Sequence, residues 1–573
     1  MKKFVIGILT GLILAVLTGV VFIFSAMRLG ERRPDVPDGA TLVLRLGNDV
    51  PEKEPVEVPL PFIGSADTLT VLDIWEGLRS AATDPRVKAV ILETGRVGAG
   101  WGKLHELREG LDAFRKSGKP LVATMRSPNS RDYYVASAAD RVYMSPEDLF
   151  DVKGVRAEVM YLKNALGKLG VAVEIEHRGK YKDAGDMFSE TSMSPESREV
   201  INSILDGVYS EMIRAFAEGR KRPAEEIRAL VDAGPYTARQ AAAKGLVDAL
   251  RYEDQVHGEL KSRLKQDELK RYSFHSYVRA TSGTAGRGAK KKIAFVVGEG
   301  AIARGEGTDA MGSDEGFTSG AFIKMLRRVG SDSSIGGVIL RVDSPGGDAV
   351  ASDEMLREVR LLSKKKPMVI SFSDAAASGG YYISMTGDPI VSYPNTVTGS
   401  IGVIYGKVNL RGLYDKIGVN KEILTRGTNA AIDSDYEPMT PEARAKLREG
   451  IEEIYREFVS RVAEGRNKKW EEVAPLAEGR AWLGSQAKQN GLVDELGGID
   501  KAVAMVKKRV GLKPEDKVDL VPYPPARSIF DQYLKSTSEQ QVEARVAKLL
   551  GFDYRVWMQG GMLRMAPYRV DIR

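Results

Sequence analysis

One serine lies in a stretch of residues too small to cover it. Ser378 follows three alanines and precedes two glycines and two tyrosines in "SDAAASGGYYIS" (373–384). A serine at the start of a helix lies beside backbone N–H groups that have no intrahelical partner. Gly379 leaves its own N–H uncovered, so that it can bind an oxyanion. The stretch is typical of an exposed nucleophile with an adjacent oxyanion donor, and a capping or packing serine is the ordinary alternative.

A second glycine segment precedes a predicted helix. "LRVDSPGGDAVASDEM" (340–355) ends a predicted strand with Ser-Pro-Gly-Gly and continues into a helical pattern. Gly346 and Gly347 can present backbone N–H groups to a ligand. An ordinary Pro-Gly turn is the alternative. The segment predicts a second oxyanion donor only if it lies beside Ser378.

The possible bases for a serine nucleophile are few. The chain has no cysteine, which excludes thiol nucleophiles, Cys-ligated zinc and disulfides, and it has four histidines. His177, in "EIEHRGKYKDAG" (174–185), is one candidate base, and the second half of the chain contains no histidine. A lysine is the alternative, as in Ser-Lys variants of the catalytic triad. It acts as a base only where burial or nearby positive charge favours the neutral amine.

The chain contains an internal repeat with an offset of 248 residues. "DPRVKAVIL" (84–92) matches "DSSIGGVIL" (332–340), and "GLVDAL" (245–250) matches "GLVDEL" (491–496) near the same offset. The matched segments keep their order along the chain. We therefore predict two copies of one domain.

The repeat and the composition of the segments between its copies divide the chain into five parts. The predicted parts are an N-terminal anchor (1–29), a first repeat (40–265), a Gly/Ser/Thr-rich basic linker (266–292), a second repeat (293–512) and a C-terminal tail (513–573). The tail has apolar and basic residues and no readable motif. Packing against the domain and contact with a membrane or subunit are both open for it.

Each copy alternates apolar runs with amphipathic segments. "KIAFVVG", "GGVILRVDSP", "PMVISFSD" and "PIVSYP" in the second copy are typical of strands, and 320–330 and 351–366 of helices. Strands alternating with helices predict a layered α/β core with parallel strands. The segment 439–466 predicts a long helix, with Thr440 as N-cap and Pro441 in the first turn.

Length, charge and the N-terminus bound the class of protein. The 573 residues suffice for two to four domains, and the net charge of +6 is spread along the chain without a nucleic-acid-binding pattern. An uncharged run of 24 residues, Phe4 to Met27, is long enough to span a bilayer as a helix. "FSAMRLG" is a poor cleavage site, so an uncleaved anchor is predicted. Basic residues flank the run on both sides, so that charge alone leaves the orientation open.

Four separated motifs together resemble a known family. "RGKYKDAG" (178–185), "RVDSPGG" (341–347), "AASGGYY" (376–382) and "TGSIGV" (398–403), on a duplicated chain with an N-terminal anchor, resemble the signal peptide peptidase A (protease IV) family in its long double-domain form. The resemblance extends from the anchor to about residue 512. It implies tandem crotonase-like, Clp-protease-like α/β domains and a Ser-Lys dyad.

The resemblance assigns roles to five residues. It makes Ser378 the nucleophile, Lys182 the general base and acid, and Ser400 the residue that orients the lysine amine. Gly379 and Gly347 become the oxyanion-hole donors, and no cofactor or metal is implied. Several family members have asparagine where this chain has Asp343, which changes the local charge and keeps the glycines.

The two copies hold complementary halves of this set. At the offset of 248, Lys182 corresponds to Ala430, Ser378 to Ser130, and Ser400 to Val152. The first copy keeps the lysine without the serine environment, and the second keeps the reverse. The site must therefore form where two copies meet, either within one chain or between protomers.

The resemblance also implies a biological setting. It implies a membrane-anchored serine endopeptidase that hydrolyses remnant signal peptides and other unfolded apolar peptides. It further implies a homo-oligomer, with a tetramer favoured, and catalytic domains on the periplasmic face of the bacterial inner membrane.

Two rival functions remain open at the level of sequence. An acyl-CoA enzyme of the crotonase class also uses Gly-rich oxyanion holes, without requiring Ser378 and Lys182 together. A catalytically inactive membrane scaffold is the second rival, because duplicated enzymes sometimes lose activity.

Overall fold

The structure is a computed structural model, and it describes residues 35–53, 68–282, 286, 288–305, 317–525 and 562–565. Within these ranges no helix combines the length and apolar character needed to cross a membrane. The predicted anchor, 1–29, lies outside the described residues.

The first copy folds around a six-stranded parallel sheet with the order β8-β4-β3-β2-β1-β9. Its central strand β2 is covered on both faces, and Val90, Ile91 and Leu92 are at most 1% exposed, as expected for a parallel sheet between helices. The strands are β1 (Ala40–Asn48), β2 (Val87–Val97), β3 (Leu121–Met125), β4 (Arg141–Met144), β8 (Ala249–Leu250) and β9 (Arg271–Ser273).

Helices cover this sheet and continue beyond it. They are α2 (Val71–Thr83), α3 (Trp101–Arg115), α4 (Ser130–Ala136), α5 (Lys163–Leu169), α6 (Asp186–Ser189), α7 (Pro195–Arg220), α8 (Ala224–Asp232), α9 (Ala238–Ala243), α10 (Glu253–Leu264) and α11 (Phe274–Thr281). The short strands β5 (Leu149–Phe150) and β7 (Tyr236–Thr237) form a separate antiparallel pair.

The second copy repeats the same strand order. Its sheet contains β20-β16-β15-β13-β10-β21, which matches the first sheet strand for strand and confirms the predicted duplication of an α/β fold. Two further strands, β17 and β19, extend the sheet beside the end of β15. The strands are β10 (Lys291–Glu299), β13 (Ile335–Ser344), β15 (Met368–Ala377), β16 (Ile390–Ser392), β17 (Val397–Gly399), β19 (Ala481–Leu483), β20 (Glu495–Leu496) and β21 (Val518–Tyr523).

The helices predicted in the second copy are confirmed. The long helix α16 begins after Thr440, whose side chain accepts a hydrogen bond from the Ala443 N–H at 3.1 Å, a standard N-cap. The helices are α12 (Ser319–Ser331), α13 (Ala349–Lys365), α14 (Gly379–Tyr382), α15 (Arg411–Ile417), α16 (Pro441–Gly465), α17 (Trp470–Val473), the 3₁₀ turn η1 (Ala474–Leu476), α18 (Gly484–Gln489) and α19 (Ile499–Arg509).

A third sheet joins the two copies. Its order is β12-β11-β14-β22-β18-β6. The strands are β6 (Ala172–Arg178), β11 (Ile302–Ala303), β12 (Phe317–Thr318), β14 (Gly346–Asp348), β18 (Val403–Asn409) and β22 (Met562–Met565).

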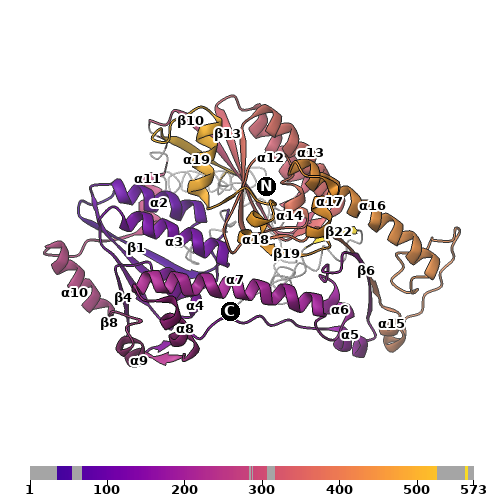
Figure 1. The fold of residues 1–573 in the computed structure, drawn as a ribbon, viewed down its shortest axis with the longest axis horizontal. Helices are drawn as coiled ribbons and strands as arrows, with labels where there is room; N and C mark the ends of the chain where they lie inside the picture. Colours follow the sequence, from indigo (N-terminus) through magenta and orange to yellow (C-terminus); the bar gives the residue numbers. More distant parts are fainter. Residues whose placement is uncertain are drawn as a thin grey trace, which may run out of the picture.

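Strand β6 leaves its own copy to enter this sheet. It pairs antiparallel with β18 along its whole length, from Arg178 opposite Val403 to Ala172 opposite Asn409. Figure 1 shows β6 and α5 far from the sheet of the first copy, among the orange elements of the second, with α7 running along the boundary. The segment that follows β6 is thereby delivered to the second copy.

The predicted linker and tail contain elements of the two sheets. Strand β9 and helix α11 lie within 266–292, where β9 is the sixth strand of the first sheet and Phe274 of α11 packs against Gly77 of α2. Strand β21, within the tail, takes the equivalent place in the second sheet. The boundaries at 265 and 512 stay predictions.

Candidate active site

Ser378 lies at the junction between β15 and α14. It has φ +53° and ψ −114° and is fully buried in the single chain, and its N–H donates to the Gly399 oxygen at 2.7 Å. A non-glycine residue with this backbone costs about 1–3 kcal/mol, and such strain tends to occur at functional sites. The strand end therefore holds the hydroxyl in one orientation at a sharp turn.

Lys182 of the first copy reaches this serine. Its Nζ lies 2.9 Å from Ser378 Oγ, 2.9 Å from the Ser400 carbonyl oxygen and 3.0 Å from Ser400 Oγ. The side chains of all three residues are fully buried. The structure thus brings together the three residues that the sequence separates by 196 and 22 positions.

The loop that carries Lys182 is held by the second copy. Arg178 pairs with Glu452 at 2.8 Å and with Glu478 at 2.9 Å, and the Tyr181 N–H donates to the Glu478 oxygen at 2.9 Å. A Cβ on Gly479, which has φ +78°, would lie only 2.6 Å from Lys182 Cβ. Glycine is therefore required there both for the left-handed backbone and for the close approach.

Ser400 has a strained backbone like that of Ser378. It follows β17 with φ +50°, and its N–H donates to the Arg480 oxygen at 2.8 Å. Its hydroxyl and its carbonyl oxygen both accept from the lysine amine. Two acceptors on one residue restrict the direction in which the amine points.

The two predicted oxyanion donors lie on elements in contact. Gly379 is the first residue of α14, so its N–H has no partner within that helix. Gly347 lies in β14, which contacts α14, and a Cβ at residue 347 would overlap the carbonyl oxygen of Ile302. Gly380 approaches the turn before β14 closely, since a Cβ there would lie 2.7 Å from the Ser344 oxygen.

The residues that correspond to Ser378, Lys182 and Ser400 in the opposite copy have ordinary structural positions. Ser130 is the first residue of α4, and its Oγ donates to the Gly154 oxygen at 3.2 Å. Asn129 caps that helix. Ala430 lies exposed in a turn, and Val152 is buried.

The histidine considered as a base lies elsewhere. His177 is exposed on β6, with Nδ1 3.1 Å from the Gly179 oxygen. His105 is buried between Glu109 and Glu211; burial lowers its pKa, the two carboxylates raise it more, and the net pKa is about 9. Lys182, and not His177, occupies the hydrogen-bonding position at the Ser378 hydroxyl.

Acidic groups lie close to the lysine in sequence. Burial, reinforced by Asp183, raises the pKa of Asp186 to about 7. Neither aspartate was singled out from the sequence, nor was the Glu478–Gly479 turn that supports the lysine loop. A Glu-Gly pair in a loop carries no signal of a contact with a residue almost 300 positions away.

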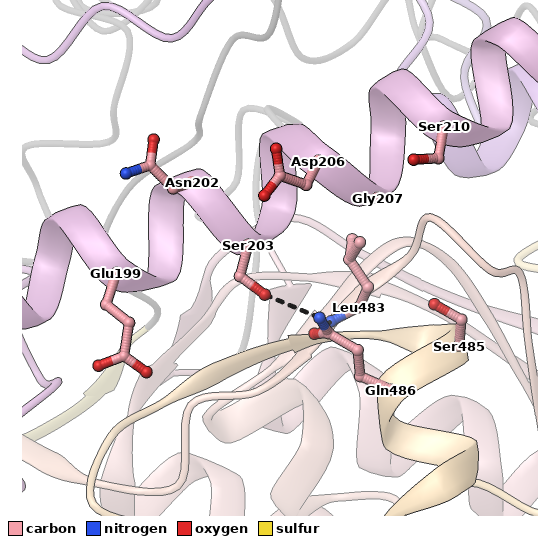
Figure 2. Close-up of a pocket in the computed structure, with 9 residues that line it drawn as sticks. All are labelled: Glu199, Asn202, Ser203, Asp206, Gly207, Ser210, Leu483, Ser485 and Gln486. Atoms are coloured by element: carbon pink, nitrogen blue, oxygen red, sulfur yellow. Dashed lines mark hydrogen bonds between the residues drawn. The ribbon is translucent and has the colours of Figure 1, made fainter. Parts of the chain in front are cut away.

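One cavity lies beside the candidate site and not within it. It has a volume of about 540 Å³ and is lined by one face of α7 and by the segment from Leu483 to Gln486. Figure 2 shows Gln486 reaching up to α7, where its Nε2 donates to Ser203 Oγ at 2.8 Å. Its lining is polar and includes none of the five predicted site residues.

Comparisons with known proteins agree with this division into two halves. The model of peptidase family S49 matches residues 113–267 and 360–513, more than half of the chain, and the two matches contain Lys182 and Ser378 respectively. The chain is 33% identical over 459 residues to a chloroplastic serine protease SPPA of Arabidopsis thaliana, covering 79% of this chain and 68% of the relative.

Two bacterial relatives extend the comparison. The chain is 31% identical over 470 residues to protease 4 of Salmonella typhi, covering 79% of this chain and 74% of that protein. It is 34% identical over 236 residues to a putative signal peptide peptidase SppA of Enterococcus faecium, covering 41% of this chain and 69% of the relative. With two matched regions on one duplicated α/β chain, this protein belongs to peptidase family S49 and is a serine peptidase.

Proposed function

We propose that this chain is a serine endopeptidase that uses a Ser378–Lys182 dyad to hydrolyse unfolded apolar peptides, remnant signal peptides among them. The observation that carries the proposal is the 2.9 Å separation of Lys182 Nζ and Ser378 Oγ in a buried setting. At this distance a neutral amine can accept the proton of the hydroxyl directly.

The reaction runs through an acyl-enzyme. Ser378 Oγ attacks the peptide carbonyl carbon while its proton passes to Lys182 Nζ, and the oxygen of the tetrahedral intermediate accepts hydrogen bonds from the Gly379 and Gly347 N–H groups. The lysine then gives its proton to the leaving amine as the C–N bond breaks. Water, deprotonated by the same amine, hydrolyses the ester and restores Ser378.

Ser400 serves as the residue that orients the amine. Its Oγ and carbonyl oxygen both lie within 3.0 Å of Lys182 Nζ, which holds the amine in line with the Ser378 hydroxyl. A positioned base is worth about 10²–10⁴ in rate. Loss of the Ser400 hydroxyl removes one of the two acceptors and is expected to cost only part of that factor.

An extended peptide fits the sheet beside the dyad. Strands β14 and β18 flank one position of the third sheet, and β22 of the same chain lies there, antiparallel to both. Gly347 of β14 is opposite Arg564 in this pairing. We infer that a substrate binds as a strand in the same place, since backbone pairing accepts any side chains and alternate residues can enter pockets.

The apolar character of the substrate rests on similarity. One relative is named a putative signal peptide peptidase, and the motifs quoted from this sequence resemble that family. The predicted anchor at residues 1–29 would keep the enzyme at the bilayer where such remnants lie. We propose the periplasmic face of the bacterial inner membrane as the location of the two catalytic copies.

The repeat supports a homo-oligomer. The first copy contributes β6 to the second copy's β18, but its own equivalent of β18, residues 155–161, has only a single bridge residue, Ala157, and forms no strand in the part of the chain that the structure describes. The second copy's equivalent of β6, residues 420–426, likewise forms none there. Pairing these two segments between chains would repeat the internal junction from protomer to protomer.

Exposed apolar side chains lie on both segments. Met160 is 68% exposed and Leu424 is 92% exposed. Large apolar side chains at this exposure mark interaction surfaces when they cluster. We propose that chains associate head to tail through 155–161 and 420–426, with a tetramer favoured by the family resemblance. Sedimentation of the purified protein tests this, and a Leu424→Asp variant is expected to shift the assembly towards monomer.

Matched alanine variants test the dyad. Ser378→Ala and Lys182→Ala are each expected to reduce peptide hydrolysis by at least about 10⁴-fold with unchanged circular dichroism. A fluorophosphonate probe should label the parent at Ser378, label Lys182→Ala far more slowly, and leave Ser378→Ala unlabelled. Hydrolysis that survives either substitution would reject the proposed mechanism, and a parent protein that neither hydrolyses peptides nor reacts with the probe would favour the two rival functions.

A further inference from the structure

Helix α3 of the first copy begins against strand β15 of the second. Asp374 Oδ2 accepts a hydrogen bond from the Gly100 N–H at 3.0 Å, and Oδ1 accepts one from the Lys103 N–H at 2.8 Å. A Cβ on Gly100 would overlap the Asp374 carboxyl group, and one on Gly102 would lie 2.7 Å from the Ser373 oxygen. Glycines at the start of α3 permit this approach.

The repeat shows that this cap comes from the opposite copy. Helix α3 corresponds to α13, and at the offset of 248 Gly100 corresponds to Asp348 and Lys103 to Ala351. In the second copy Asp348 caps its own helix by accepting from the Ala351 N–H at 2.8 Å. In the first copy Gly100 has no side chain to do this, and Asp374 supplies the carboxylate across the domain boundary.

The ammonium group of Lys103 strengthens the same contact. It lies 2.9 Å from Asp343, 3.5 Å from Glu299 and 4.0 Å from Asp374, and its side chain is 4% exposed. Burial lowers the pKa of Lys103, but the carboxylates raise it by more. The net pKa lies well above its usual value, so the amine stays charged. Burial raises the pKa of Asp374 to about 6, and Lys103 opposes that rise.

The two aspartates lie on the strands that end at the proposed catalytic groups. Asp374, on β15, precedes Ser378 by four residues, and Asp343, on β13, precedes Gly347 by four. The two strands are neighbours, and the Ala375 N–H donates to Asp343 Oδ1 at 3.0 Å. One lysine of the first copy thus contacts both strand ends.

We propose that Lys103 and the N-terminus of α3 form a lock with Asp343 and Asp374 that positions Ser378 relative to the Gly347 oxyanion donor. These four groups are positioning residues, since none touches the proposed reacting atoms. The inference rests on the proposed function, because it assigns a purpose to the lock only if Ser378 is the nucleophile.

The lock gives a role to the segment of the first copy that corresponds to the proposed oxyanion segment of the second. Residues 98–100 of the first copy, Gly-Ala-Gly, stand where the second copy has the Gly346-Gly347-Asp348 of the oxyanion segment. In place of binding an oxyanion, the helix start that follows them binds a carboxylate of the other copy. The carboxylate is bound by the Gly100 and Lys103 N–H groups, which follow Ala99, the equivalent of Gly347.

A pair of variants separates positioning from stability. Asp374→Ala removes the cap and the tether together. Adding Gly100→Asp to Asp374→Ala gives α3 its own cap, as Asp348 gives α13, and the missing Asp374 side chain leaves room for it; the tether to β15 stays absent. Thr237→Ala, which removes the N-cap of α9 away from the interface, is the matched control for losing a cap alone.

Full-length protein is assayed for melting temperature and for kcat and KM on a fluorogenic apolar peptide. Asp374→Ala is expected to lower Tm by about 2–4 °C and kcat by about tenfold or more, with KM within about twofold. Thr237→Ala should lower Tm similarly and leave kcat unchanged. The double variant should recover Tm and keep the low kcat.

Recovery of kcat together with Tm in the double variant would overturn the proposal, because stability alone would then explain the loss. Unchanged kcat in Asp374→Ala would overturn it directly. If Asp374→Ala yields no folded protein, Asp374→Asn carries the test, with a kcat fall of about threefold or more expected and an unchanged kcat refuting the lock. Ser378→Ala is measured alongside: if it retains hydrolysis the proposed function fails, whereas an inactive Ser378→Ala with normal Asp374 variants defeats only the lock.

Discussion

A single methyl group added at Gly479 should push the loop that carries Lys182 away from Ser378. Gly479 has φ +78°, and a Cβ there would lie 2.6 Å from both Lys182 Cβ and Lys182 N. Gly387 provides a matched control, because it has φ +88° with nothing within 4 Å of the added Cβ. Alanine at either position suffers the same backbone strain, but only residue 479 meets Lys182.

The expected magnitude follows from these distances. Non-bonded carbon atoms settle about 3.5–4.0 Å apart, so a methyl at 2.6 Å must displace the lysine loop by roughly 1 Å. Lys182 Nζ now lies 2.9 Å from Ser378 Oγ, and a further 1 Å would exceed the usual limit of about 3.2 Å for this bond. Misplacement of this size costs about 10²-fold in rate. The left-handed backbone adds about 1–2 kcal/mol of destabilisation in both variants.

Steady-state kinetics and thermal unfolding of the two variants provide the assay. Gly479→Ala and Gly387→Ala should lose comparable stability from backbone strain, with any relaxed overlap adding to the loss at 479, but only Gly479→Ala should lose about 10² in kcat. Fluorophosphonate labelling of Ser378 should slow in parallel, since the serine would be less activated. If Gly479→Ala keeps kcat within threefold of Gly387→Ala, the amine position does not control turnover and the reasoning fails.

Three further measurements test other parts of the structure. The value of kcat/KM should rise between about pH 6 and pH 10, because the base must be a neutral amine; a flat profile with chemistry rate-limiting would count against Lys182. Burial, with Asp73 and Asp519, raises the pKa of Glu76 from 4.5 to about 7 in the folded state. The protonated side chain therefore contributes to folding stability, fully below pH 4.5, and this contribution is lost as pH rises through 7. Glu76→Gln should therefore stabilise the protein at pH 8 by up to about 3 kcal/mol and leave it unchanged at pH 4, as urea unfolding at the two pH values would reveal. Removing residues 561–573, which include β22, should lower KM for peptides by about threefold or more by freeing the place beside β14; an unchanged KM would show that β22 does not compete with substrate.

Local patterns in the sequence predicted the elements that end at the site. The apolar runs that became β10, β13, β15 and β16 were recognised, as was the helix after Thr440. The family resemblance points to Ser378, Lys182 and Ser400, and in the structure Lys182 Nζ lies within 3.0 Å of both serine hydroxyls. The strands and helices are predictable because periodicity and capping depend on residues a few positions apart.

Contacts between segments far apart in the sequence are beyond the reach of such patterns. The composition of residues 266–292 predicts a linker, yet β9 within them is the sixth strand of the first sheet and Phe274 of α11 packs against Gly77 of α2. The cap that Asp374 provides to α3, and the turn at Gly479 that supports Lys182, were not expected. In each case the partner lies about 200 to 300 residues away in the sequence, so the neighbouring residues carry no signal of the contact.

What the sequence alone determined is the set of residues: two copies of one domain, with Ser378 and its glycines in the second copy and Lys182 in the first. What tertiary structure decided is which half meets which, through the exchange of β6 into the sheet of the second copy. The physical reason is that strand pairing is made by backbone groups common to every residue. The identity of the partner strand is then selected by the packing of both domains together, which no local pattern records.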